Sequence, residues 1–423
     1  MKVVLINKSD STGGAAVVTF RLMEALRAAG VDARMLVAEK RRDSAFVELA
    51  SGRRSLRKAF LSERLKIFLA NGMSRETLFR IDTASDGVPL WHHRWVEEAD
   101  VVCLNWVNQG LLSIDGLVKL LATGKPVVWT MHDMWCMTGI CHHAGECLGY
   151  RGECGECPLL ERKGGPCDLS YEVWKRKDDI YYYGKRKITF VAVSHWLEEL
   201  SKHSLLLSGQ RVEVIPNAFP LDDEDVSALV QAKNRGDGKK RIIFGAARLD
   251  DPIKGLDTLR EATLVLRDRY PEVAERLEIE AFGNVKDRRS LRGFGIALRH
   301  LGRLEGREAI ASVYRKGDIV VSSSDYETLP GTLVEGQAWG CVPVAFDHGG
   351  QGDIIDHLKT GYLAPYSEDL TARAASLAEG IVWAARQDCG IIQPMRESVE
   401  NRFSSRSVAS SYIRLFRQLL KME

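Results

Sequence analysis

Residues 319–335 read IVVSSSDYETLPGTLVE, and this stretch decides the fold of the half of the chain that contains it. An apolar run that breaks into serines is typical of a buried strand, and the helix expected from Gly331 and Thr332 follows a short polar loop. Glu327 lies in that loop, and Glu335 lies a turn into the helix. A helix start offers unpaired N–H groups to phosphate, and a nearby carboxylate can accept hydrogen bonds from sugar hydroxyls. The stretch therefore predicts a site for a nucleotide sugar.

Length and composition are those of an ordinary globular enzyme. The 423 residues are enough for two domains of about two hundred residues each. The chain has 59 basic and 57 acidic side chains, and the resulting net charge of +2 argues against a general attraction to nucleic acid. The chain opens on the strand-like MKVVLIN and has no apolar run of membrane-spanning length, so we expect a cytoplasmic protein.

Short apolar runs alternate with helix-like sequence along the first half of the chain. The run 3–6 is followed by the loop NKSDSTGG, by a helical pattern that ends at Gly30, and by a second strand at 34–38. Further strands are predicted at 101–105, 126–130 and 189–193. Short apolar runs separated by helices are typical of a parallel sheet that is buried on both faces.

The same alternation starts again after a break near 214–223, which carries two prolines and an acidic cluster. Strands are predicted at 242–246, 277–282, 319–322 and 342–346, with a helix at 255–268. The fold class is therefore α/β, with two doubly wound, Rossmann-like domains whose strand ends face a cleft. We expect the domains at 1–215 and 216–400, and a final helix at 401–423 that crosses back to the first domain.

The loop RLDDPIKG places two cationic side chains directly after the strand at 242–246. Arg248 offers a bidentate guanidinium and Lys254 a point charge, and together they match a diphosphate whose charge grows as it leaves. A solvated loop with two ordinary charges is the alternative. With Glu327 and Glu335 in the same predicted domain, diphosphate binding is the better interpretation.

These residues, taken together, resemble the GT-B retaining glycosyltransferases of family 4. The likeness continues in GAARLDDPIKG from Gly245, AVSHW from Ala192, VIPNAF from Val214, AFG from Ala281 and TMHDMW from Thr130, so it spans nearly the whole chain. The residues that match the family's Glu-x7-Glu element in order are Ser324, Glu327, Glu335, Gly336, Ala338, Gly340, Pro343 and Val344.

The resemblance implies roles for individual residues. Glu327 corresponds to the carboxylate that holds hydroxyls of the donor sugar, and Glu335 to the one that holds the ribose of the nucleotide. Arg248 and Lys254 correspond to the clamp on the diphosphate. His132, at the end of a predicted strand, is similar to the histidine that faces the donor sugar.

Two loops would contribute backbone to the donor site. Gly13 and Gly14 match the family's glycine loop, where a missing side chain lets the backbone approach donor phosphate or acceptor. The loop Leu329, Pro330, Gly331 and Thr332 would add amides to the diphosphate clamp. It reads TLPG from Thr328 where many members have GFG, and Pro330 removes one N–H donor.

The implied reaction moves a hexosyl group from a UDP- or GDP-sugar to an acceptor hydroxyl with retention, in EC class 2.4, without a metal or other cofactor for catalysis. The implied acceptor is a saccharide, lipid-linked, in the synthesis of capsule, exopolysaccharide or O-antigen. Two alternatives stay open. A sugar-nucleotide epimerase shares the fold, and a non-catalytic scaffold would use a cysteine-rich loop to bind a partner.

Six of the nine cysteines fall within residues 136–167. Cys141, Cys147, Cys154 and Cys157 include a CxxC pair, and four soft ligands so close together predict a structural zinc site. Disulfides and unreactive free thiols are the alternatives. Because the segment follows His132, we expect it to shape the acceptor site.

Residues 52–80 interleave basic and apolar side chains in a helical pattern. One interpretation is an amphipathic helix that lies on the inner face of the cell membrane, where a lipid-linked acceptor is found. The other is an ordinary helix that covers the first sheet with its charges in water. The basic residues are Arg53, Arg54, Arg57, Lys58, Arg64, Lys66, Arg75 and Arg80.

Overall fold

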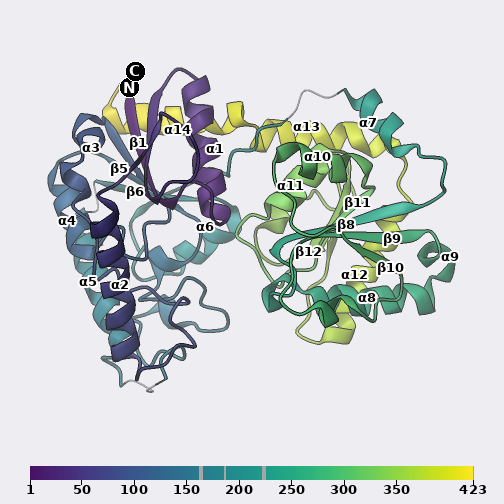
Figure 1. The fold of residues 1–423 in the computed structure, drawn as a ribbon, viewed down its shortest axis with the longest axis horizontal. Coiled ribbons are helices and arrows are strands. Elements are labelled where there is room, and N and C mark those ends of the chain that lie inside the picture. The colour runs from purple at the N-terminus through teal and green to yellow at the C-terminus, as the bar shows by residue number, and fades with distance from the viewer. Residues whose placement is uncertain (162–164, 185–186, 222–224, 423) are drawn as a thin grey trace. The chain divides into compact units, whose positions relative to one another are not determined.

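The computed structural model describes residues 1–161, 165–184, 187–221 and 225–422. The chain divides into two compact units (Figure 1). Unit 1 comprises Met1–Ala218 and Val408–Glu423, and unit 2 comprises Phe219–Ser407. Part of the break predicted near 214–223 lies outside the described residues.

Unit 1 is built on a seven-stranded parallel sheet with the order β3-β2-β1-β4-β5-β6-β7. Chain order is reversed on one side of β1 and runs forward from β4, so the sheet has the doubly wound arrangement with a switch point between β1 and β4. The strands are β1 (Lys2–Ser9), β2 (Asp32–Glu39), β3 (Val47–Leu49), β4 (Val101–Leu104), β5 (Val127–Met131), β6 (Ile188–Ala192) and β7 (Arg211–Val214).

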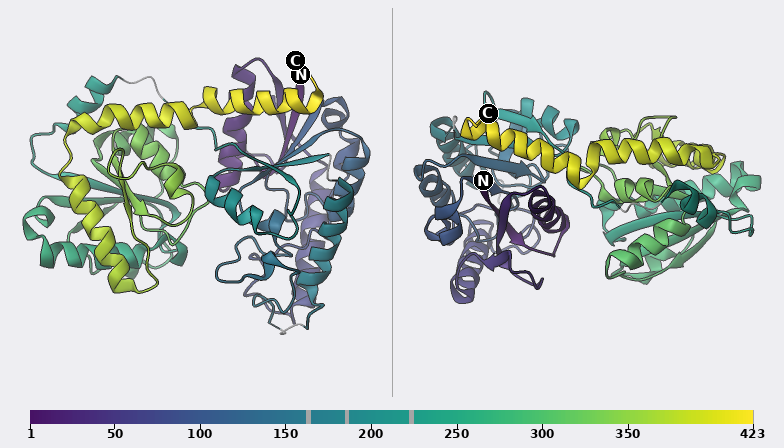
Figure 2. Two further views of the ribbon diagram at one scale, coloured as in Figure 1. Left: turned by 180° about the vertical axis from the view of Figure 1, so that it is seen from behind. Right: turned by 90° about the horizontal axis from the view of Figure 1, so that it is seen from above.

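Helices cover both faces of this sheet, and the last helix of the chain is one of them. They are α1 (Gly14–Ala28), α2 (Arg53–Ala70), α3 (Arg94–Glu98), α4 (Ile114–Ala122), α5 (Leu169–Gly184), α6 (His195–Lys202) and α14 (Ser405–Leu420). Val408, Tyr412 and Phe416 of α14 are buried in the same core as β1, β2 and α1 (yellow helix in Figure 2). The Tyr412 hydroxyl also hydrogen-bonds Thr130 Oγ1 of β5 at 2.9 Å.

Unit 2 repeats the same strand order in a six-stranded parallel sheet, β10-β9-β8-β11-β12-β13. Its switch point lies between β8 and β11. The strands are β8 (Lys240–Arg248), β9 (Leu277–Asn284), β10 (Ala297–His300), β11 (Ile319–Ser322), β12 (Val342–Phe346) and β13 (Tyr362–Ala364). The helices are α7 (Val226–Lys233), α8 (Leu256–Arg269), α9 (Pro271–Ala274), α10 (Arg307–Lys316), α11 (Gly331–Ala338), α12 (Leu370–Ala385) and α13 (Ile392–Phe403).

The close packing of α11 on β11 depends on a glycine. A Cβ at Gly336 would lie 2.6 Å from Cγ1 of Val320, so any side chain there would push the helix away from the strand. Glycine at this position therefore lets the second half of α11 pack closely on β11.

The two doubly wound sheets confirm the predicted fold class. The sequence analysis missed β3, β7, β10 and β13, which are the edge strands of the two sheets. These strands are three or four residues long, and a short edge strand needs no continuous apolar run because one side is open to solvent. Within the described residues, we find no helix that is long and apolar enough to span a bilayer.

Candidate active site

Two loops of unit 2 meet at the carboxyl ends of β8 and β11, on the two sides of the switch point. Gly255 has a φ of +65°, and a Cβ there would lie 1.8 Å from the carbonyl oxygen of Ser323. Ser323 Oγ donates to the carbonyl oxygens of Lys254 and Gly255 at 3.1 and 2.8 Å. The two loops are therefore held as one surface at the edge where ligands bind in open α/β sheets.

Lys254 and Glu327 form an ion pair across this surface, between the Lys254 ammonium and Glu327 Oε1. The same Glu327 oxygen accepts a hydrogen bond from Ser324 Oγ at 3.0 Å, and the Glu327 carbonyl accepts one from the Gly350 amide at 2.7 Å. Both charged side chains are half-buried. Residues 73 positions apart, which the sequence analysis assigned to one site, thus lie in direct contact.

Arg248 ends β8, six residues before Lys254. Its Nη2 is 2.8 Å from Asp251 Oδ2, and its Nε is 3.7 Å from Asp250 Oδ1. The side chain is partly exposed, so the guanidinium adds positive charge to this surface and favours an anion there.

The helix that follows the β11 loop begins at this surface. Pro330 is the N-cap of α11, and its side chain makes no capping hydrogen bond to the first N–H groups. Leu329 is buried, while Gly331, Thr332 and Glu335 are partly exposed. Uncapped amides and the positive end of the helix dipole favour an anion at this point.

In unit 1, His132 lies directly after β5. Its Nε2 is 3.0 Å from Asn105 Oδ1, and Asn105 lies directly after the neighbouring strand β4. Burial lowers the pKa of His132 below its ordinary value, so the imidazole is neutral near pH 7. A neutral imidazole can donate or accept a hydrogen bond with a sugar hydroxyl.

Gly13 and Gly14 lie after β1 at the start of α1, and both are exposed. Gly13 has a φ of +91°, which favours glycine. A Cβ built on either glycine would meet no described atom within 4 Å. The backbone is therefore open to a ligand at the carboxyl edge of the first sheet.

A buried ionic network, which the sequence analysis missed, lies under this edge of unit 1. His142 Nδ1 is 2.7 Å from Asp133 Oδ2, and His142 Nε2 is 2.6 Å from Asp82 Oδ2. Arg64 of α2 pairs with the other oxygen of Asp82, and Glu63 is fully buried beside it. The network ties α2 and the segment between α2 and α3 to the loop after β5.

The network shifts the pKa of its members in opposite directions. Burial opposes the charge on His142, but Asp133 and Asp82 outweigh it and raise the pKa of His142 to about 10. Burial likewise opposes the charge on Asp133, but His142 lowers the pKa of Asp133 to about 2. Burial, reinforced by Asp82, raises the pKa of Glu63 to about 7. His142 and Asp133 are therefore both charged near pH 7.

The predicted zinc site is not supported. All nine cysteines are free thiols, and the described residues contain no group of three or more His, Cys, Asp or Glu side chains arranged to hold a metal. Burial raises the pKa of Cys141 to about 12 and that of Cys154 to about 11. Residues 162–164 of the cysteine-rich segment lie outside the described residues.

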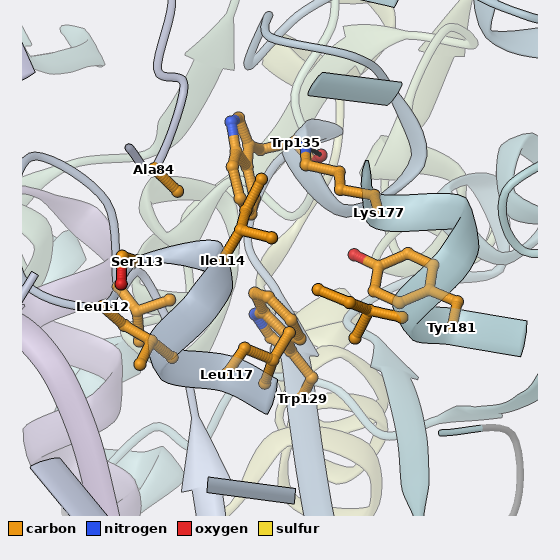
Figure 3. Close-up of a pocket in the computed structure, with 11 residues that line it drawn as sticks. Ala84, Leu112, Ser113, Ile114, Leu117, Trp129, Trp135, Lys177 and Tyr181 are labelled. Atoms are coloured by element: carbon orange, nitrogen blue, oxygen red, sulfur yellow. Dashed lines mark hydrogen bonds between the residues drawn. The ribbon is translucent and has the colours of Figure 1, made fainter. Parts of the chain in front are cut away.

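A buried lysine holds the start of the cysteine-rich segment. Lys177 of α5 donates to the carbonyl oxygens of Trp135, Thr138 and Gly139 at 2.7, 3.0 and 2.9 Å. Figure 3 shows Lys177 and Trp135 beside a small, mostly apolar pocket between α4, β5 and α5. Burial lowers the pKa of Lys177 to about 7. These contacts give the lysine a structural role.

Comparison with known proteins identifies the family. The sequence profile described as Glycosyltransferase Family 4 matches residues 12–223, which is half of the chain, and the profile described as Glycosyl transferases group 1 matches residues 239–381. The chain belongs to glycosyltransferase family 4. The two doubly wound units are the two halves of the GT-B fold.

Proteins of known structure share this fold. Sucrose-phosphate synthase from Thermosynechococcus elongatus is 18% identical, with a TM-score of 0.63, and the match covers 100% of this chain and 99% of that one. HepE from Anabaena, in a complex with UDP and glucose, is 14% identical, with a TM-score of 0.57, and the match covers 99% of this chain and 100% of that one. At these identities the likeness concerns the fold.

One curated relative is similar in sequence. WcaC of Escherichia coli K12, which is named as a glycosyl transferase of colanic acid biosynthesis, is 24% identical over 254 residues. The match spans 57% of this chain and 57% of that protein, so the chain spans little more than half the length of the curated relative that it matches.

Proposed function

We propose that this protein transfers a hexosyl group, with retention, from a UDP- or GDP-sugar to a hydroxyl of a saccharide acceptor. The contact between Lys254 and Glu327 at the switch point of unit 2 carries the proposal. It joins an ammonium, which suits a phosphate, to a carboxylate, which suits sugar hydroxyls, and this supports the proposal. HepE, of the same fold, has been crystallised with UDP-glucose, which supports a donor of this class.

Donor binding replaces one ion pair by two interactions. The diphosphate takes the Lys254 ammonium as its partner, and Glu327 is released to accept hydrogen bonds from the sugar hydroxyls. Ser324 Oγ holds Glu327 in place during this exchange. Arg248 and the uncapped amides of α11 add positive charge on the diphosphate, and Glu335 binds the ribose.

The reaction follows from this arrangement of charges. The bond between the anomeric carbon and the diphosphate breaks, the acceptor oxygen bonds to the same face, and a diphosphate oxygen takes the acceptor proton. Lys254 and Arg248 stabilise the charge that develops on the leaving group, so catalysis consists of positioning and electrostatics and requires no metal. His132 and the backbone at Gly13 and Gly14 contact the donor sugar and the acceptor.

We further propose that the acceptor is lipid-linked and serves the synthesis of capsule, exopolysaccharide or O-antigen. The likeness to a protein named for colanic acid biosynthesis supports this class of product. Helix α2 supports a membrane contact: Leu61, Leu65 and Leu69, one turn apart, are 51%, 57% and 59% exposed. Arg54, Arg57 and Lys58 are exposed on the preceding turns of the same helix.

Titration calorimetry with UDP and UDP-glucose distinguishes the roles proposed for Lys254 and Glu327. Lys254→Met should weaken UDP and UDP-glucose to a similar extent, by about tenfold to a hundredfold, because both carry the diphosphate. Glu327→Gln should weaken UDP-glucose more than UDP, because only the former has sugar hydroxyls to bind. Lys239→Met, directly before β8, and Glu272→Gln, in α9, are matched controls and should bind like the wild type.

Transfer is then measured with UDP- and GDP-sugars, with and without lipid-linked oligosaccharide. The proposal requires that donor consumption depend on the acceptor, that the product keep the anomeric configuration of the donor, and that a chelator leave the rate unchanged. Release of free UDP with an epimerised sugar would favour the epimerase. No turnover with any donor would favour the scaffold.

A further inference from the structure

The switch point of unit 1 places an aromatic side chain where ligands of open α/β sheets bind. Trp106 lies two residues after β4, and its backbone is fixed to the end of β1. The Trp106 amide donates to Asn7 Oδ1 at 2.9 Å, and the Lys8 amide donates to the Trp106 carbonyl at 2.8 Å. Because Asn7 is fully buried, its hydrogen bond holds the backbone at Trp106 in place.

The indole is fixed as firmly as the backbone. Its Nε1 donates to Asp133 Oδ2 at 2.8 Å, the same oxygen that faces His142 Nδ1. Asp133 Oδ1 accepts a hydrogen bond from the Trp135 amide at 2.8 Å. The rings of Trp106 and His142 have centroids 5.3 Å apart and planes 30° apart, so the imidazole also packs beside the indole. His142 is held from its other side by Asp82.

The support behind the indole is ionic and not apolar. Asp82 and His142 are buried and Asp133 is partly buried, although ion pairs that are removed from water gain little over apolar packing of the same shape. The tryptophan itself is only partly buried. A large aromatic ring that is held rigidly but left partly open is the arrangement of a pre-organised binding site.

The groups around the indole indicate the kind of ligand. His132 follows the adjacent strand β5 and pairs with Asn105, the residue before Trp106. An aromatic face beside groups that donate and accept hydrogen bonds fits a sugar ring, whose C–H face is apolar and whose hydroxyls are polar.

We propose that Trp106 is the platform on which a sugar ring of the acceptor stacks, and that His142 is a positioning residue that holds this platform through Asp133. The inference rests on the proposed function, because it assigns the acceptor of that reaction to the switch point of unit 1. Trp106 touches substrate, whereas His142 acts through Asp133.

The test is the indole N–H resonance of Trp106 in the full chain, identified as the signal that Trp106→Phe removes. Methyl glucosides, galactosides and mannosides serve as probes. At least one should shift the Trp106 signal while leaving that of Trp383, a partly buried tryptophan of unit 2, in place. In His142→Gln the Trp106 signal should move before any sugar is added, and saturation should need about tenfold more of the same glycoside.

Kinetics provides a second readout. Trp106→Leu should raise the acceptor KM about tenfold and leave the donor KM unchanged, and Trp383→Leu should change neither. If the wild type shows no transfer at all, the proposed function fails, while the glycoside titration still reports on Trp106. The inference is overturned if no glycoside shifts the Trp106 signal, or if an active Trp106→Leu enzyme keeps the wild-type acceptor KM.

Discussion

His142 is positively charged near pH 7 because two buried carboxylates hold it, and this charge makes its contribution to stability depend on pH. The folded protein raises the pKa of His142 from about 6.5 to about 10. The contribution is therefore complete below pH 6.5 and is lost as the pH rises through 10. His142→Gln should lower the free energy of unfolding by about 3 kcal/mol at pH 6, because it leaves Asp82 and Asp133 without their shared cation.

The free energy of unfolding of wild type and variant is measured in urea at several pH values, and the two are subtracted at each pH. That difference should shrink between pH 6.5 and 10. Comparing the two proteins cancels the opposite trend expected from Lys177, whose pKa burial lowers. His203→Gln, an exposed histidine on unit 1, should show no such trend. A difference independent of pH would contradict the charge assigned to His142.

Gly255 tests how tightly the two loops of the donor surface are joined. Gly255→Ala introduces a Cβ that would overlap the Ser323 carbonyl, in addition to the strain of a φ of +65°. Gly236→Ala is the matched control, because its φ is +71° and a Cβ there meets no described atom within 4 Å. The first variant should lose about 2 kcal/mol more stability than the second and should bind UDP less tightly. Equal losses would mean that the loops separate easily.

The sequence predicts some contacts between side chains of the site but not others. Lys254 and Glu327 follow strands with recognisable apolar runs, and parallel strands bring their carboxyl ends to one edge, so their contact was predictable. The contact of His142 with Asp82 was not, because these residues are 60 positions apart and lie in irregular segments. The zinc prediction was not supported because cysteine spacing says nothing of where the side chains point.

At the scale of elements, α2 combines two surfaces in one helix. Leu56 and Ile67 are buried against unit 1, while Leu61, Leu65 and Leu69 face solvent. Replacing these three exposed leucines by glutamine should reduce binding to vesicles that contain phosphatidylglycerol, because it removes the apolar part of the contact. The loss should be at least tenfold in partitioning, measured by sedimentation with the vesicles.

Two controls make this experiment specific. Replacing Leu205, Leu358 and Leu370, which are exposed on other elements, should leave vesicle binding unchanged. Vesicles of neutral lipid should bind the wild type weakly, because the arginines and lysine of α2 then lack a partner. Equal binding by the α2 variant and the wild type would remove the membrane proposal and leave α2 as an ordinary covering helix.

The elements also separate what sequence can and cannot reveal. The central strands β1, β4 and β11 are buried on both faces over most of their length, and β8 is buried at 242–244, so each contains a continuous apolar run. The sequences VEL of β3 and YLA of β13 carry no such signal, because they sit at the edges and are stabilised by the strand beside them. Tertiary context, which a single sequence does not provide, decides these short strands.

At the scale of the whole molecule, α14 completes unit 1 from the far end of the chain. Tyr412→Ala should destabilise unit 1 by about 4 kcal/mol, because it leaves a cavity in the core and an unpaired Thr130 hydroxyl. Calorimetry in the presence of UDP distinguishes the units, since UDP should raise the melting temperature of unit 2. Tyr412→Ala should lower the other transition.

Arg414→Ala is the matched control for this variant, because Arg414 lies on α14 two residues away and is exposed. It should leave both transitions in place. If Tyr412→Ala lowers the transition that UDP raises, the division of the chain into two units does not describe its unfolding.

The return of α14 to unit 1 also sets the order in which the polypeptide can mature on the ribosome. Synthesis proceeds from the amino end, so every residue of Phe219–Ser407 is made before Val408 leaves the exit tunnel. Unit 2 can thus fold while unit 1, which is synthesised first, still lacks α14 and exposes the apolar surface that α14 covers. We expect chaperones that recognise nascent chains to bind this apolar surface while residues 219–407 are being synthesised.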